Sequence, residues 1–183
     1  MKAILVGYSG HGLVVAESAI IMGVEFYGYT DLYEIDKNPF DLRYFGNEQS
    51  KDYNWNLTDK YVLGIGSNKL RSKAFKFLKS KSKVCLKIIN KSASVSEFSS
   101  VGEGTFIARN VSINPFSQIG NYCIVNTSSS IDHECIIENG VHLAPGSILC
   151  GNVKIGENSI IGAGSVVLSN IKNNSIVYGI PAK

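Results

Sequence analysis

The chain has 183 residues, of which 44% are hydrophobic and 18% charged, so it falls in the ordinary globular range and can bury a core. The formal net charge is only +3, and the apolar start at residues 1–7 is too short for a signal peptide or a membrane span. The four cysteines form no CxxC pair, and we expect neither a disulfide nor a zinc site. A cytoplasmic protein with no nucleic-acid partner is the default expectation.

The first ninety residues alternate between strand-like and helix-like segments. Such alternation predicts a small Rossmann-like α/β domain with a parallel sheet over residues 1–90. The second helix is rich in Lys and Arg, whose charges either form a solvated face or attract an anion. Expected strands are residues 2–7, 24–30, 61–65 and 84–89, with one helix through Val14 to Ile20 that closes at Gly23 and another through Leu70 to Leu78 that Asn68 caps.

A glycine-rich loop, Gly7 to Gly12, follows the first strand and presents backbone N–H groups and a helix N-terminus to an anionic phosphate. Its spacing departs from GxGxxG, which weakens a dinucleotide interpretation. Asp31 ends the second strand, where a carboxylate either bonds to a sugar hydroxyl or base edge or serves only as a turn residue. Residues 32–60 show no readable pattern; we expect them to help bind the acceptor without assigning any of them a role.

From Val95 onward an aliphatic residue opens every sixth position, and the fifth place of each hexad is small or β-branched. This period predicts a hexapeptide-repeat solenoid, an all-β parallel β-helix over residues 91–183, in which three hexads close one coil of eighteen residues. We expect a little over four coils, with capping and self-association because open coil ends expose strand edges. The first-place residues are Val95, Val101, Ile107, Ile113, Ile119, Val125, Ile131, Ile137, Leu143, Leu149, Ile155, Ile161 and Val167.

Four segments, in this order along the chain, together resemble the PglD/NeuD-type sugar acetyltransferases of the hexapeptide-repeat class. Many acyltransferases share the hexads, but a GxSGHG loop before a hexad domain with an IDHEC-type segment is far more specific. One departure is Asn90-Lys91, where such proteins often have His-Pro, and we expect it to affect the linker more than the chemistry. The segments are GYSGHG at residues 7–12, NTSSSIDHECII at 126–137, LAPGSILCGNVKIG at 143–156 and GIPAK at 179–183.

The resemblance implies a left-handed solenoid and acetyl-CoA as co-substrate, with no metal. It implies that His133 is the general base, that the adjacent Glu134 orients it, and that the backbone N–H of Gly151 faces the thioester carbonyl. On chemical grounds Asp132 is an alternative to Glu134 as the carboxylate that fixes the tautomer. An imidazole suits proton removal at neutral pH, and an N–H at a glycine corner suits the developing oxyanion. The implied acetyl-CoA contacts are Asn126, His142, Gly151, Ile155 and Pro181, and the implied nucleotide-sugar contacts are Ser9, Gly10, His11, Gly12, Asp31, Gly66 and Asn68.

His133 and His142 are nine residues apart, which is half a coil, so they lie on roughly opposite sides of one prism. We therefore expect a homotrimer whose active site lies between subunits, with His133 from one chain and His142 from its neighbour. The terminal GIPAK either covers part of CoA or is an ordered tail.

The leading function is N-acetylation of a nucleotide-linked amino-sugar, most plausibly a UDP-linked 4-amino-4,6-dideoxy sugar. O-acetylation of a sugar such as sialic acid is a close rival. A zinc enzyme like the γ-carbonic anhydrases and a solenoid without chemistry are the remaining alternatives, and the absence of a close His pair in the repeats disfavours the zinc enzyme.

Overall fold

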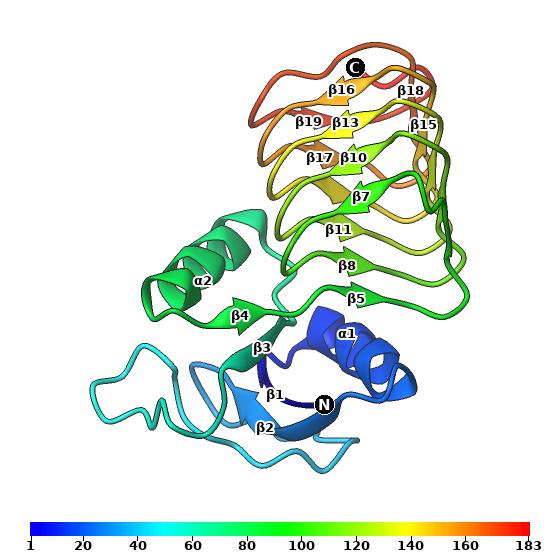
Figure 1. Ribbon diagram of the computed structural model, residues 1–183. Helices are drawn as coiled ribbons and strands as arrows, with labels where there is room; N and C mark the ends of the chain where they lie inside the picture. Colours follow the sequence, from blue (N-terminus) through cyan, green and yellow to red (C-terminus); the bar gives the residue numbers. More distant parts are fainter.

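The computed structural model describes residues 1–183, with a small α/β part at the base of a stack of short strands (Figure 1). The α/β part contains β1 (Lys2–Val6), α1 (Gly10–Ile21), β2 (Glu25–Thr30), β3 (Lys60–Leu63), α2 (Asn68–Ser80) and β4 (Val84–Cys85). Its four strands are all parallel in the order β2-β1-β3-β4, which confirms the predicted parallel α/β fold. Neither helix has the length and apolar character that a bilayer span requires.

From β5 onward the chain winds into a parallel solenoid, as the period of six predicts, and its left hand is the one that the resemblance implies. It has about five coils, compared with the predicted number of a little over four. Strands of successive coils pair in parallel and make three faces (Figure 1). Face 1 consists of β5 (Ile88–Ile89), β8 (Phe106–Ile107), β11 (Ile124–Val125), β14 (His142–Leu143), β17 (Ile160–Ile161) and β19 (Ile176–Val177). Face 2 consists of β6 (Ser94–Val95), β9 (Ser112–Ile113), β12 (Ser130–Ile131), β15 (Ile148–Leu149) and β18 (Val166–Val167). Face 3 consists of β7 (Ser100–Val101), β10 (Gln118–Ile119), β13 (Ile136–Ile137) and β16 (Lys154–Ile155).

The solenoid interior is filled by the two restricted places of the hexads. All first-place residues from Ile107 to Val167 are buried, and so are the fifth-place residues from Thr105 to Ser165. Several buried hydroxyls donate to backbone carbonyls further along the chain; Ser117 Oγ, for example, donates to the carbonyl of Asp132 at 2.7 Å. This bond ties the interior to the corner that carries His133.

Both ends of the solenoid extend beyond the predicted hexads. The strand expected over residues 84–89 is divided, since β4 joins the α/β sheet and β5 pairs with β8 in face 1. At the other end Val177 pairs with Ile161, only sixteen residues earlier, so the last coil is two residues short and leaves the period of six. These additions account for more coils than the count of hexads predicts.

The α/β part is bonded directly to the solenoid, with α1 lying beneath the first coil and α2 beside it (Figure 1). Asn90, at the unusual Asn90-Lys91 junction, is buried and donates to Ser18 Oγ of α1 at 2.9 Å. Arg109 forms an ion pair with Glu17 at 2.7 Å. One hydrophobic cluster includes residues of both parts, and the division of the chain at residue 90 therefore stays a prediction.

Candidate active site

His133 lies at the corner between faces 2 and 3, where it is half exposed. Its Nδ1 is 3.0 Å from Glu134 Oε2, and Glu134 has a positive φ of 59° that places the two side chains together. Asp132 is occupied elsewhere, because its Oδ1 accepts from Asn114 Nδ2 at 2.9 Å and from the backbone N–H of His133 at 2.8 Å. The hydrogen bond from Asn114 also lowers the pKa of the Asp132 carboxyl. Glu134 is thus the carboxylate that contacts the imidazole.

Gly151 lies one coil further along at the same corner, directly against the imidazole. A Cβ at this position would be 2.6 Å from His133 Cε1 and 2.7 Å from Nε2, so only glycine fits under the ring. The backbone N–H of Gly151 donates no hydrogen bond within the chain. The corner therefore combines a free donor with the ring nitrogen that Glu134 leaves open, which is the pairing that acyl transfer to an amine requires.

His142 lies on face 1, away from that corner, next to Asn126 and His11. Asn126 Nδ2 is 3.4 Å from His142 Nε2, and the His11 ring packs edge-on against Phe106 with centroids 5.6 Å apart. Burial and the nearby charge of Arg71 lower the pKa of His142 to about 4. Burial, Arg71 and His142 lower the pKa of His11 to the same value, and His11 Nε2 has no partner in the chain. Both rings are accordingly neutral at physiological pH.

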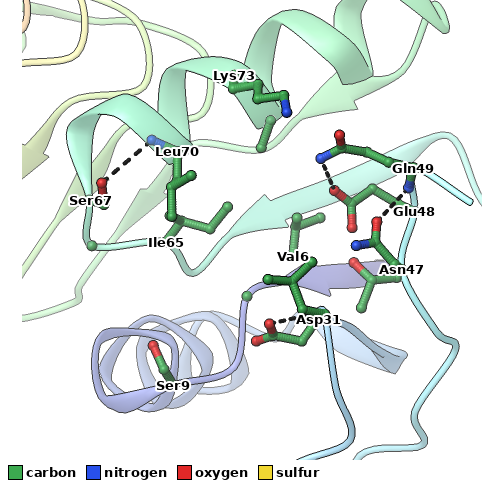
Figure 2. A pocket seen from close by; sticks show the side chains of 15 residues that line it. Val6, Ser9, Asp31, Asn47, Glu48, Gln49, Ile65, Ser67, Leu70 and Lys73 are labelled. Carbon is green, nitrogen blue, oxygen red and sulfur yellow. Dashed lines mark hydrogen bonds between the residues drawn. The ribbon is translucent and has the colours of Figure 1, made fainter.

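A cavity of about 450 Å³ lies at the carboxyl ends of β1, β2 and β3, between the N-termini of α1 and α2 and the loop at residues 47–49 (Figure 2). Ser9, Asp31 and Gly66 of the predicted nucleotide-sugar contacts line it. Asp31 accepts backbone N–H bonds from Tyr8 at 2.9 Å and from Leu32 at 2.7 Å. A carboxylate at the switch between strands is well placed for ligand binding in open α/β sheets.

The other predicted nucleotide-sugar contacts lie outside this cavity. Gly10 is exposed at the start of α1. Gly12 is buried, and a Cβ on it would be 2.4 Å from the Gly7 carbonyl oxygen, so Gly12 allows the helix and the loop to pack closely. His11 faces the solenoid. Asn68 is not the cap of α2, because Ser67 accepts the bond from Leu70 N–H.

Two of the predicted acetyl-CoA contacts, Ile155 and Pro181, differ in exposure. The side chain of Ile155 is fully buried inside the solenoid, so the expectation that it contacts CoA is wrong; first-place residues point inward. Pro181 is exposed in a tail that folds back, with Ala182 N–H bonded to the Val166 carbonyl at 2.8 Å. Its role toward CoA stays a prediction.

Two buried charged residues near these sites escaped prediction. Arg71 is 1% exposed and donates five hydrogen bonds, to Asn68 Oδ1 and to carbonyls of both parts of the chain. Glu48 is 5% exposed and lines the cavity. The sequence carried little signal for either, since Arg71 belongs to a basic helix and Glu48 to the stretch without pattern. No group of three or more His, Cys, Asp or Glu side chains is arranged to hold a metal ion.

Comparison with known families identifies both parts of the chain. Residues 2–78 match the PglD N-terminal domain, and residues 134–169 match the bacterial transferase hexapeptide model of six repeats. The chain is 27% identical over 123 residues to the GDP-perosamine N-acetyltransferase of Escherichia coli O157:H7, covering 67% of this chain and 56% of that protein. Across the first curated relatives that it matches, the chain spans between 29% and 56% of their lengths.

Two solved structures resemble the whole chain. The acetyltransferase domain of PglB from Neisseria gonorrhoeae is 26% identical, with a TM-score of 0.85 over all of this chain and 98% of that domain. That domain has also been solved in complex with acetyl coenzyme A. PerB from Caulobacter crescentus, solved with CoA and GDP-perosamine, is 27% identical, with a TM-score of 0.84 over all of this chain and 96% of that protein.

Proposed function

Since the chain belongs to the PglD-type hexapeptide-repeat acyltransferases, we propose that it transfers the acetyl group of acetyl-CoA to the amino group of a nucleotide-linked amino-sugar. The observation that carries the proposal is the corner where His133 lies between Glu134 and Gly151. Further support comes from a CoA ligand in both solved neighbours and from GDP-perosamine in PerB. A cytoplasmic location remains part of the proposal.

The proposed chemistry follows from the two nitrogens of the imidazole. In the tautomer in which Nδ1–H donates to Glu134, Nε2 carries no proton and can take one from the attacking amine. As the new C–N bond forms, the carbonyl oxygen becomes an oxyanion that the N–H of Gly151 stabilises. Collapse breaks the C–S bond, and the CoA thiolate leaves with the proton from the imidazolium. Glu134 stabilises that imidazolium while it is charged.

The active site we propose lies between subunits of a homotrimer. His133 is at the corner of faces 2 and 3, whereas His142 is on face 1, so one chain does not bring them together. The same corner carries Phe98 and Phe116, which are 72% and 61% exposed and have ring centroids 5.8 Å apart. An exposed aromatic pair beside a reactive histidine favours a corner that a neighbouring subunit covers.

On this arrangement, the face-1 surface around His11, Asn126 and His142 of one subunit receives the His133 corner of the next. This surface lies close to the cavity of the α/β part, because a Cβ placed on Gly66, which lines the cavity, would be 3.4 Å from the Cβ of His11. A nucleotide held in the cavity would therefore direct its sugar toward His11 and His142. The neutral state of both rings suits contact with an uncharged acetyl group or sugar hydroxyls.

An acceptor panel tests the proposal. Purified protein is incubated with acetyl-CoA and with UDP-, dTDP- and GDP-linked amino-sugars and sialic acids, and CoA release and acetylated product are measured. The predicted UDP-linked 4-amino-4,6-dideoxy sugar and GDP-perosamine are the first acceptors to compare. We expect turnover of an amino-sugar that His133→Ala lowers by about 10²- to 10⁴-fold. Turnover of hydroxyl acceptors alone would replace N-acetylation by the O-acetylation alternative.

A further inference from the structure

The cavity in the α/β part has two helix N-termini at one end and the acidic side chain of Glu48 at the other, with Asp31 and Lys73 also in its lining. At one end lie Ser9 and Ser67, which precede the first turns of α1 and α2, so the unpaired N–H groups and the positive dipole ends of two helices converge there (Figure 2). At the other end lies the carboxylate of Glu48 (Figure 2). A nucleoside diphosphate whose phosphates lie at the two helix N-termini would place its base at Glu48.

Glu48 is a largely buried residue whose carboxylate opens to the cavity and has a single hydrogen-bond partner in the chain. The residue is 5% exposed, forms no ion pair, and accepts one long bond, from Gln49 Nε2 to Oε1 at 3.4 Å. Figure 2 shows the carboxylate turned toward the centre of the cavity. A carboxylate that faces a cavity and has one long bond from the protein can accept further hydrogen bonds from the donors of a bound ligand.

The side-chain amide of the neighbouring Asn47 adds a hydrogen-bond donor to this end of the cavity. Asn47 Oδ1 accepts from the backbone N–H of Gln49 at 2.7 Å, which fixes the amide plane and leaves Nδ2 without an acceptor in the chain. In Figure 2 the Asn47 side chain lies between Glu48 and Asp31. The end of the cavity therefore offers two carboxylate oxygens as acceptors and one amide as a donor.

We propose that Glu48 selects guanine as the base of the nucleotide-sugar, an inference that rests on the proposed function. The Watson–Crick edge of guanine presents N1–H and the N2 amino group as adjacent donors and O6 as an acceptor. Two adjacent donors match the two oxygens of one carboxylate, and O6 matches the Asn47 amide. The apolar side chains of Val6, Ile65 and Leu70 also line the cavity.

The same geometry disfavours uracil, the base predicted from the resemblance. Uracil and thymine present a single N3–H between two carbonyl oxygens, and both oxygens would face the negative charge of Glu48. Leaving the carboxylate unpaired, or setting it against acceptors, costs binding free energy. Specificity at this site thus comes from rejection of the pyrimidine as well as from attraction of guanine.

Binding of GDP, inosine diphosphate and UDP to the full chain, measured by calorimetry without acetyl-CoA, tests the inference. Inosine diphosphate keeps N1–H and O6 but lacks the amino group, so it isolates one of the two bonds to Glu48. We expect GDP to bind at least about tenfold more tightly than UDP, with inosine diphosphate in between. UDP binding as tightly as GDP would overturn the choice of base while leaving acetyl transfer untouched.

Glu48→Gln keeps the size of the side chain and removes its charge, and Glu34→Gln is the matched control, since Glu34 is exposed and does not line the cavity. We expect Glu48→Gln to weaken GDP by about tenfold and to change UDP by less than twofold. Equal losses for both nucleotides would also overturn the inference, because they would indicate a contact to the ribose that all nucleotides share. Failure of every nucleotide to bind would overturn the placement of the nucleotide itself and, with it, the proposed function.

Discussion

The imidazole of His133 lies directly over the α-carbon of Gly151, eighteen residues further along the chain and one coil away. The two residues are adjacent because each coil takes eighteen residues, so positions that differ by this number stack at one corner. An imidazole and a free backbone donor are thereby held by the regular backbone of the solenoid and not by flexible loops, which favours a fixed geometry between them.

Gly151→Ala should impair acetyl transfer through the position of the imidazole. A Cβ at 2.6 Å from the ring cannot coexist with it, so His133 must turn away. We expect kcat to fall by at least about tenfold with little change in the melting temperature, since Gly151 is at the surface. The same substitution in a His133→Ala background should have almost no further effect on kcat. An undiminished effect there would mean that Gly151 acts without His133.

The period of six determined most of what the sequence could predict. First and fifth places such as Ile131 and Cys135 are buried because the period itself defines the inside of the prism. His133 occupies the third place of the same hexad, which faces away from the interior. It lies next to Gly151 because the two residues are one coil of eighteen residues apart. The separation of His133 and His142 on different sides of the solenoid was predicted on the same basis and is confirmed.

Features that depend on contacts between the two parts of the chain were not predictable. Serine and asparagine are both favourable at a helix N-cap. Ser67 caps α2, whereas the side chain of Asn68 donates to the carbonyl of Asn158 in the solenoid. Glu48 lies in a stretch without periodicity, so its burial depends on how a long loop packs. Arg71 belongs to a basic helix, and only the packing of α2 against the solenoid shows that it is buried.

The neutral histidines His11 and His142 make the stability of the fold depend on pH. The pKa of His142 is about 4 in the folded chain and near 6.5 in the unfolded chain, so the unfolded state binds more protons between these values. Stability is full above about pH 6.5 and is lost as the pH falls toward 4. From pH 7 to pH 5 we expect about 2 kcal/mol of loss from this residue.

Urea unfolding at pH 7 and pH 5 and at one protein concentration measures this dependence. His142→Gln should reduce the difference between the two pH values by about 2 kcal/mol, because glutamine does not titrate in this range. His11 has a pKa lowered to the same value and should contribute in the same direction. An unchanged pH difference in His142→Gln would show that His142 is solvated in the native assembly.

Arg71 should be the side chain that most strongly couples the two parts of the chain. Its Nε donates to the Tyr122 carbonyl at 2.8 Å, its Nη2 to the Gly140 carbonyl at 3.1 Å, and its Nη1 to the Gly66 carbonyl at 2.8 Å. Arg71→Met leaves these buried acceptors unpaired, and we expect about 3 kcal/mol or more of lost stability in urea unfolding.

The matched control for this substitution is Lys76→Met, on an exposed position of the same helix, which should change stability by less than about 0.5 kcal/mol. Because Arg71 also holds Gly66 at the cavity, milder replacement by lysine should raise KM for the nucleotide-sugar more than it lowers kcat. Similar stabilities for Arg71→Met and Lys76→Met would contradict the coupling role.

Mixed trimers distinguish an active site shared between subunits from one contained in a single chain. His133→Ala and His142→Ala homotrimers should each be nearly inactive. In a shared site, His133 comes from one chain and His142 from its neighbour. A His142→Ala chain still has His133, and a His133→Ala chain still has His142. Random 1:1 trimers therefore contain an intact site wherever the His133 corner of a His142→Ala chain meets face 1 of a His133→Ala chain. About a quarter of all sites then satisfy both conditions, and we expect about a quarter of the wild-type activity after refolding the two variants together. Refolding each variant alone provides the control, and if the mixture recovers no activity, both histidines act within one chain or only one of them takes part in the reaction.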